Sequence, residues 1–272
     1  MSHKADNRPI GVFDSGLGGL TVVAALSRLL PDEDIIYLGD TARVPYGDKS
    51  VDSIRSFALQ DAEFLFSRGV KMIVVACNTV SAVAMKTLHQ NYPTSSILGV
   101  LEAGIRAAVR TGRKKITVLG TRATINSDAY RRGIHAVDPS IIVESIACPL
   151  LVPMAEEGIV DNDLACAVLD IYLNKVKNNP PDAILLGCTH YPLFQNALNR
   201  YFENRVQIID SATACADYVS DFIQKNDLCA TPGKGAKNSF FVTDLHSEFA
   251  VHAARFLSHP PERVQKIVLT ED

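Results

Sequence analysis

Short apolar runs recur along this chain, and a helical pattern follows most of them closely. The clearest run spans residues 72–76, where two valines and an isoleucine stand among five apolar residues. An unbroken run of this length is typical of a strand that is buried on both faces of a parallel sheet. Apolar residues then recur at helical spacing through Val80, Val83 and Leu88. The stretch therefore predicts a central strand that leads directly into a helix.

The same alternation of strand and helix is expected along most of the chain. Four such strands are predicted in the first part of the sequence and four in the second. Alternating strands and helices favour an α/β fold with doubly wound parallel sheets. The expected strands cover residues 9–13, 34–39, 72–76, 96–101, 115–120, 141–146, 183–187 and 206–209.

The two groups of strands are separated by nearly constant offsets. Ile10 and Ile116 are 106 residues apart, and Cys77 and Cys188, which follow the third strand of each group, are 111 residues apart. We interpret this spacing as an internal duplication. It predicts two similar doubly wound α/β lobes related by pseudo-twofold symmetry, with the active site in the cleft between them.

The chain is expected to cross between the lobes twice. The first lobe is predicted to comprise residues 1–98 together with 208–272, and the second lobe residues 99–207. The last part of the chain does not fit the repeat, and we expect it to pack back on the first lobe. It predicts a loop, a short strand, a helix and an edge strand, at 226–238, 239–243, 245–257 and 263–270.

Composition and charge narrow the classes of partner. The 272 residues carry a formal net charge of −3, so the chain offers no basic field for nucleic acid. No apolar run approaches the ~18 residues of a membrane-spanning helix, and the polar segment 1–9 does not resemble a signal peptide. Six cysteines at wide, irregular spacings are expected to be reduced thiols in a cytoplasmic protein.

Two of the cysteines stand where expected strands end. Cys77 follows the strand at 72–76, and Cys188 follows the strand at 183–187. Ligands bind at the carboxyl ends of strands in open α/β sheets, and a helix N-terminus favours a thiolate. One such cysteine alone would more often be a buried core residue, but the duplication places two at matching positions. The other cysteines lack this context and are interpreted as structural: Cys148, Cys166, Cys215 and Cys229.

Two thiols on opposite sides of one cleft suit one kind of reaction. One thiolate removes a proton from a stereogenic carbon, and the other thiol returns a proton to the opposite face, which is racemisation or epimerisation. A free thiol has a pKa of about 8.5, so it can serve as base or as acid near neutrality. Residues that can form hydrogen bonds follow both cysteines, namely Asn78 and Thr79 after the first and Thr189 and His190 after the second.

Four motifs carry a resemblance to a known family. In this order along nearly the whole chain, they resemble the cofactor-independent glutamate racemases of the aspartate/glutamate racemase superfamily. The motifs are Asp-Ser-Gly-Leu-Gly-Gly at 14–19, Gly-Asp-Thr-Ala-Arg-Val-Pro-Tyr-Gly at 39–47, Ala-Cys-Asn-Thr at 76–79 and Leu-Gly-Cys-Thr-His-Tyr-Pro at 186–192.

The resemblance implies an enzyme that interconverts L- and D-glutamate and supplies D-glutamate for peptidoglycan. It implies that the enzyme uses no pyridoxal phosphate and no metal, and a homodimer is expected. Cys77 would serve the D-isomer and Cys188 the L-isomer, with Asp14 and His190 as further catalytic residues. The substrate would be held by Asp14, Ser15, Tyr46, Gly47, Asn78, Thr79, Thr189 and His190.

The two predicted helpers of the cysteines each have a plainer alternative. Asp14 lies at a strand end beside the Cys77 strand, and it is expected to contact the substrate ammonium or to assist proton loss from Cys77. The alternative is an aspartate that caps the next helix. His190 is expected to stabilise or protonate the Cys188 thiolate, and the alternative is a hydrogen-bonded structural histidine.

Two further carboxylates are expected just outside the first layer of the site. Asp40 is predicted to orient Asp14 or a water molecule, with a turn residue before Pro45 as the alternative. Glu156 is predicted to lie near His190, with a solvated loop charge as the alternative.

Rival functions remain open on the residues alone. Gly16, Gly18 and the acidic Asp40 resemble a dinucleotide fingerprint, which favours an oxidoreductase. The third glycine position is taken by Thr21, however, and Asp14 would place a negative charge where a pyrophosphate should bind.

A metal-binding or solute-binding module could use Cys188 and His190, although zinc needs three or four ligands at recognisable spacing. Within the superfamily, an aspartate racemase is the nearest competitor, because no charge in the four motifs reads the length of the side chain.

Overall fold

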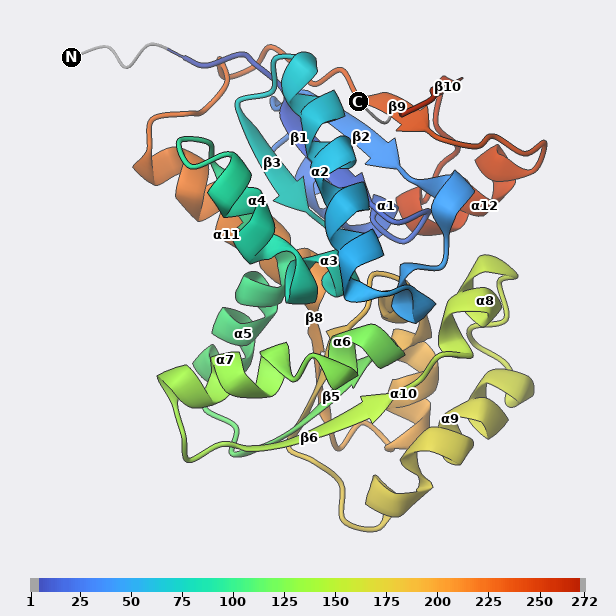
Figure 1. Cartoon of the computed structure of the whole chain (residues 1–272). Coiled ribbons are helices and arrows are strands. Elements are labelled where there is room, and N and C mark those ends of the chain that lie inside the picture. Colours follow the sequence, from blue (N-terminus) through green and yellow to red (C-terminus); the bar gives the residue numbers. More distant parts are fainter. Residues whose placement is uncertain (1–4, 270–272) are drawn as a thin grey trace.

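The computed structural model describes residues 5–269 and arranges them as two parallel sheets, one above the other in Figure 1. The first sheet has the strand order β10-β9-β2-β1-β3-β4, and the second has the order β6-β5-β7-β8. The strands are β1 (Ile10–Asp14), β2 (Ile35–Gly39), β3 (Met72–Val75), β4 (Ile97–Gly99), β5 (Lys115–Gly120), β6 (Ile142–Ala147), β7 (Ala183–Gly187), β8 (Gln207–Asp210), β9 (Ser239–Val242) and β10 (Val264–Lys266).

Helices alternate with these strands and cover both faces of each sheet. Three short 3-10 helices lie in the loops that follow strands: η1 (Thr41–Arg43), η2 (Tyr46–Asp48) and η3 (Tyr191–Phe194). The α-helices are α1 (Leu20–Leu29), α2 (Val51–Ser67), α3 (Asn78–Val83), α4 (Met85–Asn91), α5 (Val100–Arg110), α6 (Arg122–Asn126), α7 (Ala129–Val137), α8 (Leu151–Glu156), α9 (Asp163–Lys177), α10 (Gln195–Tyr201), α11 (Ser211–Lys225) and α12 (Phe249–Leu257).

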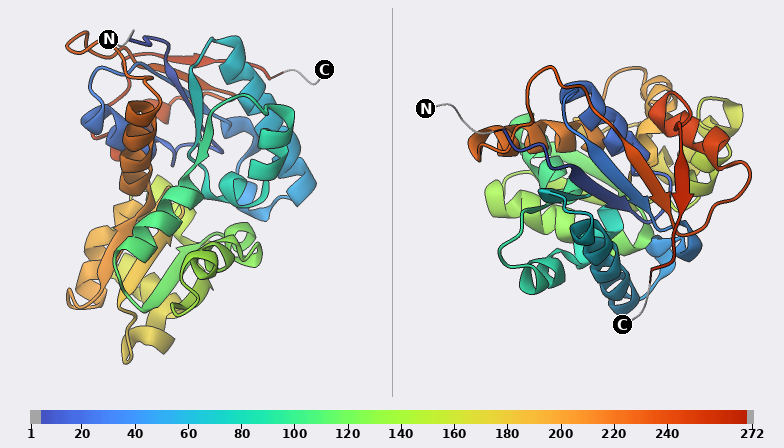
Figure 2. Two further views of the ribbon diagram at one scale, coloured as in Figure 1. Left: turned by 90° about the vertical axis from the view of Figure 1, so that its left-hand side faces the viewer. Right: turned by 90° about the horizontal axis from the view of Figure 1, so that it is seen from above.

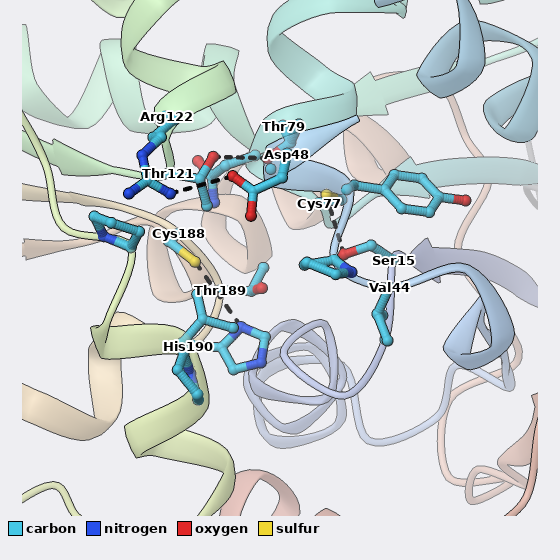
Figure 3. Close-up of a pocket in the computed structure, with 18 of the residues that line it drawn as sticks. Ser15, Val44, Asp48, Cys77, Thr79, Thr121, Arg122, Cys188, Thr189 and His190 are labelled. Carbon is cyan, nitrogen blue, oxygen red and sulfur yellow. Dashed lines mark hydrogen bonds and ion pairs between the residues drawn. The ribbon is translucent and has the colours of Figure 1, made fainter. Parts of the chain in front are cut away.

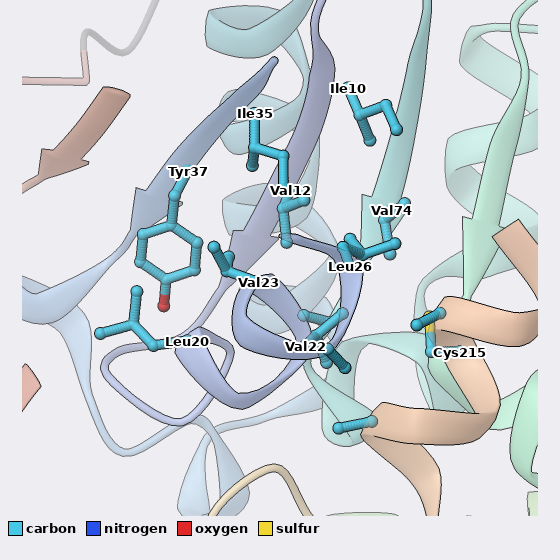
Figure 4. Packing of buried hydrophobic residues seen from close by; sticks show 14 of the residues in the cluster. Ile10, Val12, Leu20, Val22, Val23, Leu26, Ile35, Tyr37, Val74 and Cys215 are labelled. Carbon is cyan, nitrogen blue, oxygen red and sulfur yellow. The ribbon is translucent and has the colours of Figure 1, made fainter. Parts of the chain in front are cut away.

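The central strands are apolar throughout because both of their faces are covered. In β1, Val12 belongs to a core cluster shared with α1, α11 and α12, whereas Phe13 belongs to a cluster shared with α2. Figure 4 shows the first of these clusters, in which Val12 and Val74 pack against Val23 and Leu26 of α1. Successive residues of one strand thus pack against helices on opposite sides of the sheet.

The two lobes repeat one strand order. The first four strands are arranged β2-β1-β3-β4, and the next four are arranged β6-β5-β7-β8. All strand pairs in both sheets are parallel. The predicted fold class of two similar doubly wound α/β lobes is therefore confirmed, and β3 and β7 occupy corresponding places. The side view in Figure 2 shows the lobes stacked with the carboxyl ends of their strands toward each other.

The last part of the chain packs on the first lobe, as predicted. Strand β9 pairs with β2, and β10 pairs with β9 at the edge of the six-stranded sheet. The helix α12 begins at Phe249, four residues later than position 245, and the expected edge strand at 263–270 is shorter. Its last residue, Thr270, lies outside the described residues.

Both boundaries of the predicted division into domains fall inside strands. The boundary at 98/99 falls inside β4 of the first sheet, and the boundary at 207/208 falls inside β8 of the second sheet. A boundary after Asp210 would keep β8 with its own sheet, and the division itself stays a prediction. Residues 1–4 of the segment expected not to be a signal peptide lie outside the described residues. Across residues 5–269, no helix combines the length and the apolar character that crossing a bilayer requires.

Candidate active site

A cavity of about 640 Å³ lies between the carboxyl ends of the two sheets, and both lobes line it (Figure 3). Cys77 and Cys188 both line this cavity, one from each lobe. Among the residues expected to hold a substrate, Asp14 alone does not line it. The others do: Ser15, Tyr46, Gly47, Asn78, Thr79, Thr189 and His190.

Cys77 caps the N-terminus of α3 and is 5% exposed. Its thiol donates to Ser15 Oγ at 3.6 Å, and the backbone N–H of Val80 also faces the sulfur. Burial and then the negative charge of Asp14 nevertheless raise the pKa of Cys77 to about 12. The helix N-terminus favours a thiolate here, as expected, since the Val80 N–H lowers the pKa of Cys77, but desolvation outweighs it.

Cys188 has a different set of neighbours. Its Sγ lies 3.9 Å from His190 Nδ1, and His190 Nε2 lies 3.0 Å from Glu156 Oε1. Burial lowers the pKa of His190, but hydrogen bonds with Cys188 and Glu156 outweigh it and raise that pKa to about 10. The imidazole thus carries a positive charge at neutral pH, between a sulfur and a carboxylate. Phe256 of α12 packs edge-on against the ring, with the ring centroids 5.4 Å apart.

Glu156 lies beside His190, where the sequence predicted it. Burial raises the pKa of Glu156, but the hydrogen bond and the charge of His190 outweigh it and hold that pKa below its usual value. Arg255 of α12 donates to the backbone carbonyl of Glu156, so the last helix of the first lobe contacts the end of α8 in the second. Glu156 is thereby held against His190 from both lobes.

Asp14 is fully buried at the end of β1. Its Oδ2 accepts the backbone N–H of Gly16 at 3.0 Å, and Thr189 Oγ1 lies 3.5 Å from its Oδ1. Burial raises the pKa of Asp14, while the charge of His190 and backbone N–H groups at the turn oppose that rise. The carboxylate therefore holds the turn after β1 together and also faces the Cys188 segment.

The glycines of the 14–19 motif allow the two lobes to touch. A Cβ on Gly18 would lie 2.2 Å from Thr189 Oγ1 and 2.5 Å from His190 Nδ1. A Cβ on Gly19 would lie 2.4 Å from the Cβ of Asp14. The close approach that glycine permits is thus used for packing against the Cys188 segment, and protein atoms fill the space that a pyrophosphate would need.

A row of hydrogen-bonding groups joins the lobes beside Cys77. Asn78 Oδ1 accepts the hydroxyl of Tyr130 at 2.5 Å, while Asn78 Nδ2 is buried without a hydrogen-bond partner among the described residues. Thr79 Oγ1 lies 3.0 Å from Thr121 Oγ1 across the cleft (Figure 3). Sequence reasoning missed Thr121 as a site residue, although Thr121 follows β5 directly, as Ser15 follows β1. The repeat was the signal that could have found it.

Asp40 serves a neighbour other than the expected one. Its side chain accepts Tyr46 OH, Arg43 Nε at 2.5 Å and Thr243 Oγ1 at 2.8 Å. Its hydrogen bond with Asp14 is a backbone one, in which the Asp40 N–H donates to the Asp14 carbonyl at 3.0 Å. Asp40 thus holds the Tyr46 side chain rather than orienting Asp14, because the loop after β2 folds back over the strand end.

The cavity also has walls that the sequence did not indicate. Arg122 and Asp48 form an ion pair at 3.3 Å across its mouth. An apolar side is contributed by the second lobe, and its residues have no distinctive spacing in the sequence. They are Pro149, Leu150, Val152, Pro153 and Tyr172.

The four cysteines interpreted as structural do not line the cavity. Cys148 and Cys215 are buried in core clusters, Cys166 is partly buried and Cys229 is exposed. All six cysteines are free thiols.

The chain is similar to proteins of one family along most of its length. Residues 10–219 match the Asp/Glu/Hydantoin racemase family. A glutamate racemase of Neisseria meningitidis serogroup C is 40% identical over 99% of this chain and 100% of its own length. The crystal structure of a glutamate racemase from Francisella tularensis in complex with D-glutamate has a TM-score of 0.91 and 38% identity, covering 97% of this chain and 98% of that one. An aspartate racemase from Picrophilus torridus shares the fold alone, with a TM-score of 0.55 and 20% identity over 80% of this chain and 94% of its own.

Proposed function

The chain belongs to the Asp/Glu/Hydantoin racemase family, and from that premise we propose that it interconverts L-glutamate and D-glutamate by proton transfer at two cysteines, without a cofactor. One observation carries the proposal. Two free thiols follow corresponding strands of two like sheets and line one cavity. A racemase needs an acid and a base on opposite faces of one carbon, and a duplicated fold supplies such a pair.

The transfer balances without an oxidant or a reductant. The thiolate of one cysteine takes the proton from the α-carbon, and the electron pair stays on that carbon. The thiol of the other cysteine then gives its proton to the opposite face, so the two sulfurs exchange protonation states. Cys77 takes the proton from the D-isomer and Cys188 takes it from the L-isomer, as the family resemblance implies.

The polar groups of the cavity suit an amino acid substrate. Asn78 Nδ2, a buried donor without a partner among the described residues, donates to a substrate carboxylate, and Thr79 and Thr189 line the same space. The buried charge of Asp14, one residue before Ser15, balances the substrate ammonium. We propose glutamate rather than aspartate as the substrate, because glutamate racemases match nearly the whole chain at about 40% identity. An aspartate racemase shares only the fold.

The wider setting is part of the proposal. D-Glutamate made by this enzyme would supply peptidoglycan synthesis. Free thiols at both catalytic positions suit the reducing cytoplasm. A homodimer stays a prediction, which light scattering of the purified protein would check.

Circular dichroism tests the reaction directly. The optical signal of L-glutamate should decay to zero in the presence of the protein, and that of L-aspartate should stay nearly constant under the same conditions. In deuterated water, product formed early should carry deuterium at the α-carbon, while the remaining substrate carries little. Decay of the L-aspartate signal alone would replace glutamate by aspartate, and no decay with either would refute the proposal.

A second experiment tests the chemistry without a cofactor. Dialysis against a chelator should leave the rate unchanged, and pyridoxal phosphate should not raise it. Thiol alkylation should abolish activity, and glutamate should protect against it, because the reactive sulfurs lie in the substrate cavity. Activity that depends on added zinc or pyridoxal phosphate would overturn the mechanism.

A further inference from the structure

A buried cluster of charged groups lies against the substrate-binding turn at Tyr46 and Gly47. Two carboxyl groups, those of Asp40 and Asp61, have no exposed surface. Asp61 comes from α2, and Asp40 comes from the loop after β2. The hydroxyl of Tyr46 meets both of them, with a short contact to Asp40 Oδ2 and 3.3 Å to Asp61 Oδ2.

Counting protons at this contact constrains the carboxyl groups. A phenol hydroxyl has one hydrogen, so Tyr46 can donate to one of the two carboxyl oxygens only. The shorter contact assigns that hydrogen to Asp40. The second pair of oxygens, Tyr46 OH and Asp61 Oδ2, then forms a hydrogen bond only if Asp61 supplies the proton.

The charges around the pair point the same way. Arg43 is the neighbouring cation, and its Nε contacts Asp40 at 2.5 Å. Its Nη2 forms a longer ion pair with Asp61 Oδ1, at 3.5 Å, and neither of these two atoms has a hydrogen-bond partner among the described residues. One guanidinium thus faces two buried carboxyl groups, and a second full negative charge would be poorly compensated.

Groups on the neighbouring elements also act on the pKa of Asp61. Burial and the charge of Asp40 raise the pKa of Asp61, as does Asp14 at the end of β1, while the charge of Arg43 opposes the rise. On α2 itself, Gln60 accepts from Arg43 and so draws part of the guanidinium away from Asp61. Two carboxyl groups that share one site hold a proton between them.

We propose that Asp61 is a positioning residue for substrate binding, which keeps its carboxyl proton and donates it to the Tyr46 oxygen. The inference rests on the proposed racemase function only in that Tyr46 and Gly47 hold the substrate. A Cβ on Gly47 would lie 2.9 Å from Thr121 Cβ, so this turn packs closely against the second lobe. A hydrogen bond to the Tyr46 hydroxyl therefore also fixes the position of this turn, which forms part of the cavity wall between the two lobes.

The proposal has a consequence for pH dependence. When Asp61 loses its proton at high pH, two carboxylates face one phenol oxygen and repel it. The turn then loosens, so KM should rise on the basic side while kcat changes less, because neither sulfur touches the cluster.

Three variants test this role through KM. Asp61→Asn keeps a donor toward Tyr46 and carries no charge, so its KM at neutral pH should stay within about twofold of the parent value, without the rise at basic pH. Asp61→Ala removes the donor, and KM should rise about tenfold with a smaller change in kcat. Asp52→Asn is the matched control on the same helix, where the side chain of Asp52 is 94% exposed, and it should leave both constants unchanged.

Infrared spectroscopy tests the proton itself and does not depend on racemase activity. The parent protein should show the carbonyl band of a protonated carboxylic acid in a dry site, and Asp61→Asn should lack it. Absence of that band in the parent, or a KM of Asp61→Asn as high as that of Asp61→Ala, would overturn the proposal. If Asp61→Ala does not fold, Tyr46→Phe takes its place, since it removes the acceptor and should shift the Asp61 band. Should racemisation of glutamate fail while the band is present, the function is wrong and the proton assignment stands.

Discussion

The surroundings of the two active-site thiols differ more than their positions do. Cys77 and Cys188 follow corresponding strands of two sheets with one strand order. Around Cys77 the structure places a serine hydroxyl and a buried negative charge. Around Cys188 it places a histidine that is backed by a carboxylate. Duplication of the fold thus fixed where the sulfurs lie, while the loops that follow the strands set the charge at each.

This asymmetry suits a reaction that needs one acid and one base at a time. Burial raises the pKa of Cys77 to about 12, so Cys77 holds a proton at neutral pH. A charged His190 faces the sulfur of Cys188 and stabilises negative charge that develops there. The two thiols therefore face opposite charges, a buried carboxyl group beside Cys77 and an imidazolium beside Cys188. Because enantiomers have equal free energies, kcat/KM must be the same in both directions, and the asymmetry can appear only in kcat and KM taken separately.

Replacing the thiols should give the largest effect. Cys77→Ser and Cys188→Ser each remove a group of suitable acidity, so each should lower racemisation by about 10³-fold or more. Each variant should keep one-sided chemistry, such as elimination from a substrate analogue with a leaving group at the β-carbon. The two variants should eliminate from opposite enantiomers, as chiral chromatography of the remaining analogue would show.

Two further variants complete this test. Cys148→Ser and Cys215→Ser remove thiols that do not line the cavity, so they should cost stability and leave kcat/KM nearly unchanged. If Cys188→Ser racemised glutamate at close to the parent rate, Cys77 alone would be serving both faces, and the comparison of two half-sites would lose its meaning.

Gly18→Ala should disturb the Cys188 side more than the Cys77 side. The new Cβ would overlap Thr189 Oγ1 at 2.2 Å and His190 Nδ1 at 2.5 Å, so the segment must shift. A displacement of about 1 Å near the reacting groups can cost about 10²-fold in rate, and kcat/KM should fall by that order. Gly133→Ala is the matched control, because its Cβ would meet Ile105 Cδ1 at the same 2.2 Å away from the cavity. It should lower the melting temperature and leave kcat/KM within about twofold; equal losses for both variants would contradict this reading.

Sequence reasoning found the residues whose place depends on one strand end. Cys77, Cys188 and the segments after them were predicted because an apolar run, a polar turn and a helical pattern follow one another locally. Asp61 also had a local signal, since it lies three residues after Ala58 and four before Leu65, on the buried face of α2. A carboxylate on such a face requires partners, and the sequence reading passed over it.

The remaining site residues depend on how the lobes meet. Arg122 and Leu150 reach the cavity only because the second lobe faces the first at one particular angle. The contact of Asp40 with Tyr46 depends on a loop that folds back over its strand. No periodicity encodes either arrangement. The general cleft between strand ends was predictable, whereas its walls were not.

The carboxylate behind His190 should give an intermediate effect. Glu156→Gln removes a charge-assisted hydrogen bond, which is worth about 1.5 kcal/mol at the lower end of its range. The lower end applies because the Glu156 side chain is 35% exposed. We expect kcat/KM to fall about tenfold.

The stability of this variant should depend on pH in a defined window. The folded pKa of His190 is raised from 6.5 to about 10, so its contribution is complete below pH 6.5 and is lost as the pH rises through 10. The pKa of Glu156 is lowered from 4.5, so its contribution is present above pH 4.5 and is lost as the pH falls. The difference in unfolding free energy between parent and Glu156→Gln should therefore be largest between pH 4.5 and 6.5 and vanish above pH 10. Urea titrations at several pH values would check this, with His89→Gln, an exposed histidine, as the control; a difference that grows toward pH 10 would refute it.

The ion pair at the mouth of the cavity should matter least, although it joins the two half-sites in the most visible way (Figure 3). Asp48 and Arg122 are each 58% exposed and 3.3 Å apart. Exposed pairs contribute less than about 1 kcal/mol, and salt screens them. The lobes are also held by buried contacts, among them Gly18 against Thr189. Asp48→Asn should therefore change kcat/KM by less than about fivefold at low salt, and the change should shrink as salt is added. A larger loss that persists at high salt would mean that Arg122 or Asp48 binds the substrate itself. The mouth of the cavity would then contribute to the difference between the two half-sites.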